Sequence, residues 1–123
     1  MSDKLTKLMS ELKHKLPDIR IVHVTTADGI PVFSHYFSDN NVKQDKLAAV
    51  ASSIASLSRA AAKHVLGDGF ANTVIETANG IMLMVQCQYQ NKSCVLCVTT
   101  GRQHNLGQVR YFAFKLAEVL KKI

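Results

Sequence analysis

The chain has no tryptophan, two prolines and only nine acidic residues among its 123 residues. No apolar run approaches the roughly 18 residues that a membrane-spanning helix needs, so we expect no membrane span. There are three cysteines, and an odd number fits a reducing cytoplasm better than a disulfide framework. Residues 1–16 are charged and amphipathic, without the apolar segment of a signal peptide, so we expect a cytoplasmic protein.

The shortage of acidic residues leaves a net charge of +6 and a pI near 9.4. Such a charge permits an acidic partner, including nucleic acid or an acidic lipid surface. The basic residues are scattered along the chain, however, and form no run with interleaved aromatic side chains. We therefore do not expect a nucleic-acid partner, and a module that binds nucleic acid or a small molecule remains a lesser alternative.

Hydrophobic periodicity and turn signals divide the chain into elements in the order α-β-β-α-β-β-β-α. Helices are expected at residues 5–16, 39–66 and 106–123, and strands at 19–25, 31–37, 70–77, 81–87 and 94–100. Asp39 and Asn40 are expected to cap the long helix, and Gly67 can end it by adopting a left-handed conformation. A polar turn is expected over residues 88–93.

The connections between neighbouring strands are short, which predicts antiparallel pairing. The strands at 81–87 and 94–100 are apolar at successive positions, so they need cover on both faces. We therefore expect an α/β (α+β) fold that forms a single domain over residues 1–123. Its five-stranded antiparallel sheet carries the terminal helices on one face and the long central helix on the other.

The long helix has a regular core-facing stripe and an unusual opposite face. One stripe of residues at three- and four-residue steps is expected to face the core, namely Leu47, Val50, Ala51, Ile54, Ser58, Ala61 and Val65. The opposite face carries small residues where lysine and glutamate are usual, namely Ala49, Ser52, Ser53, Ser56 and Ala60. Serine is a poor helix former, so propensity does not explain them. We interpret this face as a surface for a partner; the alternative is a solvent face that is rich in alanine and serine.

Several residues invite a chemical role. Cys94 and Cys97 have the spacing of a metal or redox motif, but residues three apart on a strand point to opposite faces. We therefore expect buried, inert thiols. His23 and His35 lie on neighbouring strands and could face one another, although two histidines alone are a weak metal signal.

No nucleophile elbow, phosphate-binding loop or pair of carboxylates is present in the sequence, so we expect no catalytic residues, no cofactor and no metal site. Arg102 is the arginine best placed to act on the nucleotide of a partner, because it is expected in a loop. We favour a solvated loop charge for Arg102.

Four stretches together resemble the roadblock/dynein light chain family, in particular its stand-alone prokaryotic members. They are residues 24–36 (VTTADGIPVFSHY), 47–62 (LAAVASSIASLSRAAA), 73–76 (TVIE) leading into Asn79-Gly80, and 105–110 (NLGQVR). The resemblance extends over nearly the whole chain and rests on diffuse patterns. Residues 17–20 (PDIR) depart from it, because the family usually has a glycine-rich, apolar segment there.

The resemblance implies a non-enzymatic homodimer that binds a Ras-like small GTPase and modulates its nucleotide cycle. In such proteins the long helices pair and the third strands join edge to edge. Carried onto this chain, the dimer surface would comprise Ala49, Ser52, Ser53, Ser56, Ala60, Thr73, Val74, Ile75 and Glu76. Lys46, Arg59 and Lys63 would be candidate contacts to the GTPase. The alternative is a structural adaptor of the dynein light chain type that has no effect on GTP hydrolysis.

Overall fold

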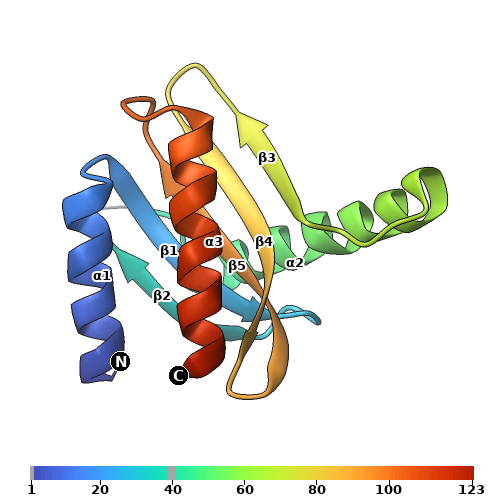
Figure 1. The fold of residues 1–123 in the computed structure, drawn as a ribbon, viewed down its shortest axis with the longest axis horizontal. Helices are drawn as coiled ribbons and strands as arrows, with labels where there is room; N and C mark the ends of the chain where they lie inside the picture. Colours follow the sequence, from blue (N-terminus) through green and yellow to red (C-terminus); the bar gives the residue numbers. More distant parts are fainter. Residues whose placement is uncertain (1, 39–40) are drawn as a thin grey trace.

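A computed structural model describes residues 2–38 and 41–123, and its elements follow the predicted order. Figure 1 labels them along the chain. They are α1 (Asp3–Lys15), β1 (Ile19–Thr26), β2 (Pro31–Tyr36), α2 (Gln44–Ala61), the π-helical turn η1 (Ala62–Leu66), β3 (Asn72–Glu76), β4 (Ile81–Tyr89), β5 (Lys92–Thr100) and α3 (Leu106–Lys122).

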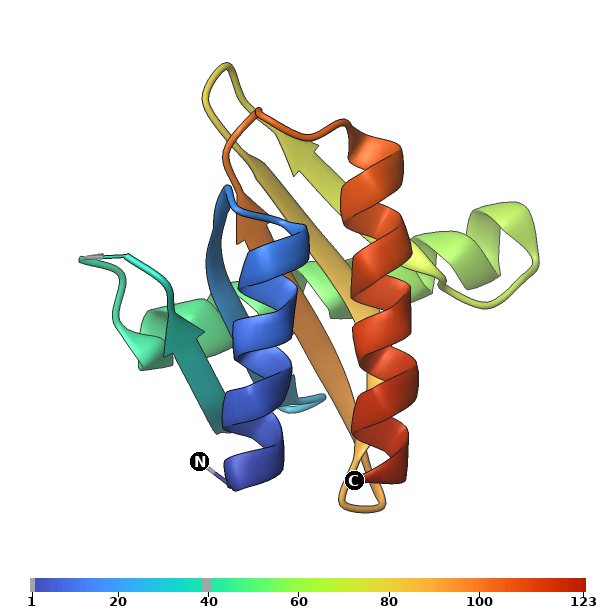
Figure 2. The ribbon, with the colours of Figure 1, turned by 60° about the vertical axis from the view of Figure 1, so that its left-hand side comes forward.

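The five strands form one sheet in the order β2-β1-β5-β4-β3, and every neighbouring pair is antiparallel. Strands β2 and β3 are therefore the two edges. Helices α1 and α3 lie on one face of the sheet and α2 crosses the other face (Figures 1 and 2). The predicted fold class is confirmed.

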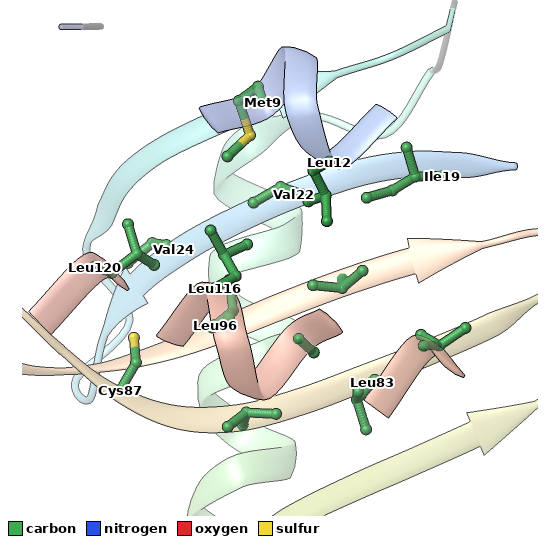
Figure 3. Packing of buried hydrophobic residues seen from close by; sticks show 14 of the residues in the cluster. Met9, Leu12, Ile19, Val22, Val24, Leu83, Cys87, Leu96, Leu116 and Leu120 are labelled. Atoms are coloured by element: carbon green, nitrogen blue, oxygen red, sulfur yellow. The ribbon is translucent and has the colours of Figure 1, made fainter. Parts of the chain in front are cut away.

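The larger hydrophobic core lies between the sheet and the helices α1 and α3. Met9 and Leu12 of α1 and Leu116 and Leu120 of α3 pack against strand residues such as Leu96, as Figure 3 shows. Each fully buried side chain of this size contributes about 1.5–3 kcal/mol. This face of the sheet is covered by the chain's own helices.

A smaller core lies under α2. Ala51 and Ala55 are fully buried against Met84, Val95 and Cys97 of the sheet. Because alanine side chains are short, the helix backbone can lie close to the strands. The long helix is therefore held by a few small contacts.

Helix α2 begins at Gln44 and not at residue 39 as predicted. Its N-cap residue, Lys43, has extended backbone and makes no side-chain cap hydrogen bond. The hydroxyl of Tyr36 donates a hydrogen bond to the Val42 carbonyl at 2.8 Å, which ties the segment before the helix to β2. The predicted caps Asp39 and Asn40 lie outside the described residues. Gly67 ends the helical segment with φ +68°, as predicted.

The hairpin between β4 and β5 is longer than predicted. Its turn consists of Gln90 and Asn91, with φ 51° and 63°, and not of the whole polar stretch 88–93. Tyr89 is buried in the larger core, as Cys87 is, so the alternation of inward-facing side chains continues beyond Cys87. Strand β3, in contrast, is shorter than its predicted range of 70–77.

Candidate functional site

The face of α2 that contacts the sheet differs from the predicted stripe. Leu47 and Ala51 are buried as predicted, but Val50 and Val65 are 40% and 79% exposed. Ala61 is exposed as well. The reason is close packing: alanines at 48, 51 and 55 allow a nearer approach to the strands than valine would. The core-facing stripe is therefore rotated away from the predicted one.

The predicted partner face of α2 is only partly open. Ala49, Ser53, Ser56 and Ala60 are exposed. Ser52, which was expected on this face, is buried instead, because it lies over the turn between β1 and β2. A Cβ added to Gly29 would come within 3.1 Å of the Ser52 hydroxyl oxygen. The rotation of the helix thus moves Ser52 out of the open surface.

Beside these small residues lies an apolar strip that sequence reasoning missed. Leu57 is 73% exposed and Leu66 is 78% exposed. Figures 1 and 2 show that the second half of α2 extends past β3, beyond the edge of the sheet. We call residues 57–66, from the turn of α2 that contacts β3 to the end of η1, the overhang. The apolar character of Leu57, on the face opposite the buried alanines, was the signal in the sequence.

A hollow of about 510 Å³ lies between the overhang and the segment that leads into β3. Ala62, Val65 and Leu66 line it on one side, and Phe70 and Thr73 line it on the other. The hydroxyls of Ser58 and Thr73 lie 2.5 Å apart and connect the helix to the strand just inside the sheet edge. Ser58 and Thr73 also line the hollow, which therefore begins at this contact and continues along the overhang.

Strand β3 forms the edge of the sheet beside the overhang. One side of it pairs with β4, and its other side has no strand partner among the described residues. Thr73 and Val74 are half-buried, whereas Ile75 is 40% exposed. Glu76 accepts a hydrogen bond from Arg102 at 2.8 Å in an exposed ion pair. An unpaired edge of this kind can accept a further strand.

The predicted cationic contacts do not gather within one chain. Lys46 lies in the first turn of α2 and Lys63 lies in η1. At 1.5 Å per residue these positions are roughly 25 Å apart along the helix. Arg59 is half-buried and lies one turn before Lys63. The single chain thus presents two separate basic points.

The histidine and cysteine pairs do not converge. His23 is paired with Ser34 and His35 with Val22, so the two histidines lie on opposite faces and do not face one another as considered. Cys94 belongs to the larger core and Cys97 to the smaller one, which confirms their predicted separation. Burial raises the pKa of Cys97 to about 12, which makes this thiol a poor nucleophile.

His23 is fully buried under α2. Its Nδ1 lies 2.6 Å from the Ser34 hydroxyl, and its Nε2 has no hydrogen-bond partner among the described residues. Burial lowers the pKa of His23 to about 4, so the ring is neutral at pH 7. In the described ranges, no three histidine, cysteine, aspartate or glutamate side chains are grouped as metal ligands would be. No described helix is long and apolar enough to cross a membrane.

Solved structures of similar fold cover almost the whole chain. An MglB with tetrameric arrangement is 18% identical with a TM-score of 0.79, covering 99% of this chain and 90% of its own. A Roadblock/LC7 domain from Streptomyces avermitilis is 21% identical with a TM-score of 0.77, covering 92% and 91%. Myxococcus xanthus MglB is 21% identical with a TM-score of 0.75, covering 99% and 90%. At these identities the likeness concerns the fold alone.

No curated protein matches this sequence. The family model of the Roadblock/LC7 domain, in contrast, matches residues 5–100, which is most of the chain. The matched range includes the sheet, the overhang and the free edge of β3. The chain belongs to the Roadblock/LC7 family.

Proposed function

We propose that this protein is a non-enzymatic homodimer that binds a Ras-like small GTPase and modulates its nucleotide cycle. The observation that carries the dimer is the overhang, which projects past the free edge of β3 with Leu57, Val65 and Leu66 exposed. Exposed apolar side chains grouped beside a free strand edge are typical of an interaction surface. The tetrameric arrangement of the related MglB supports self-association.

A dimer with two-fold symmetry would cover both the exposed apolar side chains of the overhang and the free edge of β3. If β3 of one protomer pairs with β3 of its partner, the sheet continues across the dimer, and each overhang extends over the partner's sheet. The exposed small residues Ala49, Ser53, Ser56 and Ala60 let the two long helices approach closely. Thr73, Val74, Ile75 and Glu76 lie along the joined edge. Ser52 is buried, so it would support the dimer surface only indirectly, by packing α2 onto its own sheet.

Pairing of the long helices in opposite directions also brings the separated cations together. Lys46 of one protomer then lies toward Lys63 and Arg59 of its partner, at the rim of the helix pair. The resulting basic rim suits an acidic surface on a GTPase and would speed association by electrostatic steering. We propose this rim as the GTPase contact.

The described residues offer no free loop arginine for insertion into the nucleotide site of a partner, since Arg102 is paired with Glu76. An effect on hydrolysis would therefore come from repositioning the switch residues of the GTPase itself. We propose further that residues 1–123 act as a single roadblock domain in the cytoplasm, where the three buried thiols stay reduced.

Light scattering coupled to size exclusion, followed by GTP hydrolysis with the cognate Ras-like GTPase, tests this proposal. We expect a dimeric wild type and a monomeric Ser53→Glu variant, because the charge would be buried between the paired helices. Ser10→Glu, at another exposed serine, on α1, is the matched control and should stay dimeric.

The wild type and Ser10→Glu should alter GTP hydrolysis, whereas Ser53→Glu should not. A monomeric wild type would contradict the proposal. A dimer that binds the GTPase without changing hydrolysis would instead favour the structural adaptor. A combined Lys46→Glu and Lys63→Glu variant should remain dimeric but lose GTPase binding, which separates the rim from the dimer surface.

A further inference from the structure

The face of the sheet opposite α2 carries a groove that the proposed function does not use. It runs between α1 and α3, has a volume of about 480 Å³, and continues into a second hollow of about 290 Å³. The two hollows share Leu8, Glu11, Val119 and Lys122. Figure 2 shows both helices standing side by side on this face.

The floor and inner walls of the groove are apolar. Leu12 and Leu116 are almost fully buried at its base, and Leu8 and Phe112 are half-buried above them. Val119 is 39% exposed, although its neighbour Leu120 is fully buried in the core. A docking side chain would therefore cover apolar surface that water now reaches, and this burial favours binding.

The rim of the groove is predominantly basic. Lysines outnumber glutamates there, with Lys4, Lys7, Lys15, Lys115 and Lys122 against Glu11 and Glu118. None of these lysines forms an ion pair with a carboxylate of the described residues. The rim thus presents a net positive charge, with five lysines against two glutamates, beside an apolar floor.

At one end of the groove a cation–π contact connects the two helices. The Lys15 ammonium lies 5.9 Å from the centre of the Phe112 ring and bridges α1 to α3. The other end opens past Lys4 and Ile123. From Lys4 to Lys15 the groove follows α1 for about 16 Å, which is close to three helical turns.

We propose that this groove binds an acidic amphipathic helix from a partner protein. An apolar stripe at i, i+3, i+4 and i+7 would fill the floor, and glutamates on its flanks would meet the lysines of the rim. A second copy of this chain suits the groove poorly, because its own outer helices are basic. A flat membrane could not reach the floor of a groove between two helices.

Fluorescence anisotropy of a labelled synthetic peptide tests this inference. The probe is a helix of about 18 residues, with leucine at i, i+3, i+4 and i+7 of each repeat and glutamate at most other positions. We expect binding with a dissociation constant near or below about 100 µM, weakened by salt. A scrambled peptide of equal composition and a peptide with lysine in place of glutamate should not bind.

Two variants locate the site. Val119→Glu places a charge in the groove and should weaken binding at least about tenfold, whereas Ile30→Glu, an exposed isoleucine in the β1–β2 turn, should not. A combined Lys7→Glu and Lys122→Glu variant should also lose binding. Lys46→Glu with Lys63→Glu changes the net charge equally on the other face and should retain it. Circular dichroism confirms that each variant is folded.

Three results would overturn the inference. The first is that the peptide with the apolar stripe does not bind. The second is an equal loss of peptide binding in both double-lysine variants, which would indicate non-specific charge attraction. The third is Val119-dependent binding to phosphatidylserine vesicles without peptide binding, which would indicate a membrane surface instead. Val119→Glu should leave dimerisation and GTP hydrolysis unchanged, so failure here is distinguishable from failure of the proposed function.

Discussion

The two faces of the sheet differ in how completely one chain covers them. On the face of α1 and α3, large side chains such as Met9, Leu96 and Leu120 are fully buried in one continuous core. On the face of α2, the contacts are mainly alanine against the sheet, and the overhang has little beneath it. The first face supplies most of the stability of the single chain. The second face leaves apolar surface that a partner can cover.

The largest expected effect comes from the larger core. Leu96→Ala removes a fully buried side chain at the centre of β5 and should lower the free energy of unfolding by about 3 kcal/mol, since the rigid surroundings leave a cavity. Urea denaturation followed by circular dichroism measures the loss.

The same substitution on the overhang separates the two faces. Leu57→Ala removes an exposed side chain, so the single chain should change by no more than about 0.5 kcal/mol. Self-association should weaken instead, visible as a smaller gain in stability with increasing protein concentration than in the wild type. Equal losses for Leu96→Ala and Leu57→Ala would contradict the division between a sheet face that the chain's own helices cover and one that α2 covers only in part.

A pH-dependent effect is expected on the α2 face, where His23 is buried. Burial holds the pKa of His23 at about 4, below the 6.5 of an exposed histidine, so between these pH values the unfolded chain binds more protons. Stability should therefore fall as the pH decreases from 6.5 toward 4, by at most about 3 kcal/mol at 1.36 kcal/mol per pKa unit.

His23→Asn removes the titrating ring and keeps a polar atom near Ser34. In this variant the difference in unfolding free energy between pH 7 and pH 4.5 should shrink by about 2 kcal/mol. His35→Asn, a half-buried histidine on the opposite face, is the control and should retain the wild-type pH dependence. An unchanged pH dependence in His23→Asn would show that burial of this ring does not oppose its charge.

The smallest effect is expected at the β3 edge. Arg102→Ala breaks the exposed ion pair with Glu76 and should cost about 0.5 kcal/mol or less, because solvent screens such pairs. Thermal unfolding at low and high salt measures it, and the difference from wild type should vanish at high salt. A loss above about 1 kcal/mol would assign this pair a structural role at the edge of the sheet.

Much of the fold was predictable because it depends on local patterns. Alternation along the strands placed Cys94 and Cys97 on opposite faces, and the short connections predicted antiparallel pairing; the structure confirms both. Whether His23 and His35 lie on the same face of the sheet could not be predicted from the sequence. A β-bulge between Val24 and Thr25 shifts the register of β1 and β2 by one residue, which places the two histidines on opposite faces. No pattern in the sequence indicates this bulge.

The sequence by itself determined the order of the elements, the family and the presence of an unusual small-residue helix, since these follow from periodicity and from residues close together in the chain. Only the tertiary structure decided which side of that helix is buried. Hydrophobicity favoured Val50 and Val65 for the core, but close packing on the sheet selected Ala48, Ala51 and Ala55 and buried Ser52. The overhang likewise depends on where α2 crosses the sheet edge, which is a distance between elements and not a property of either one.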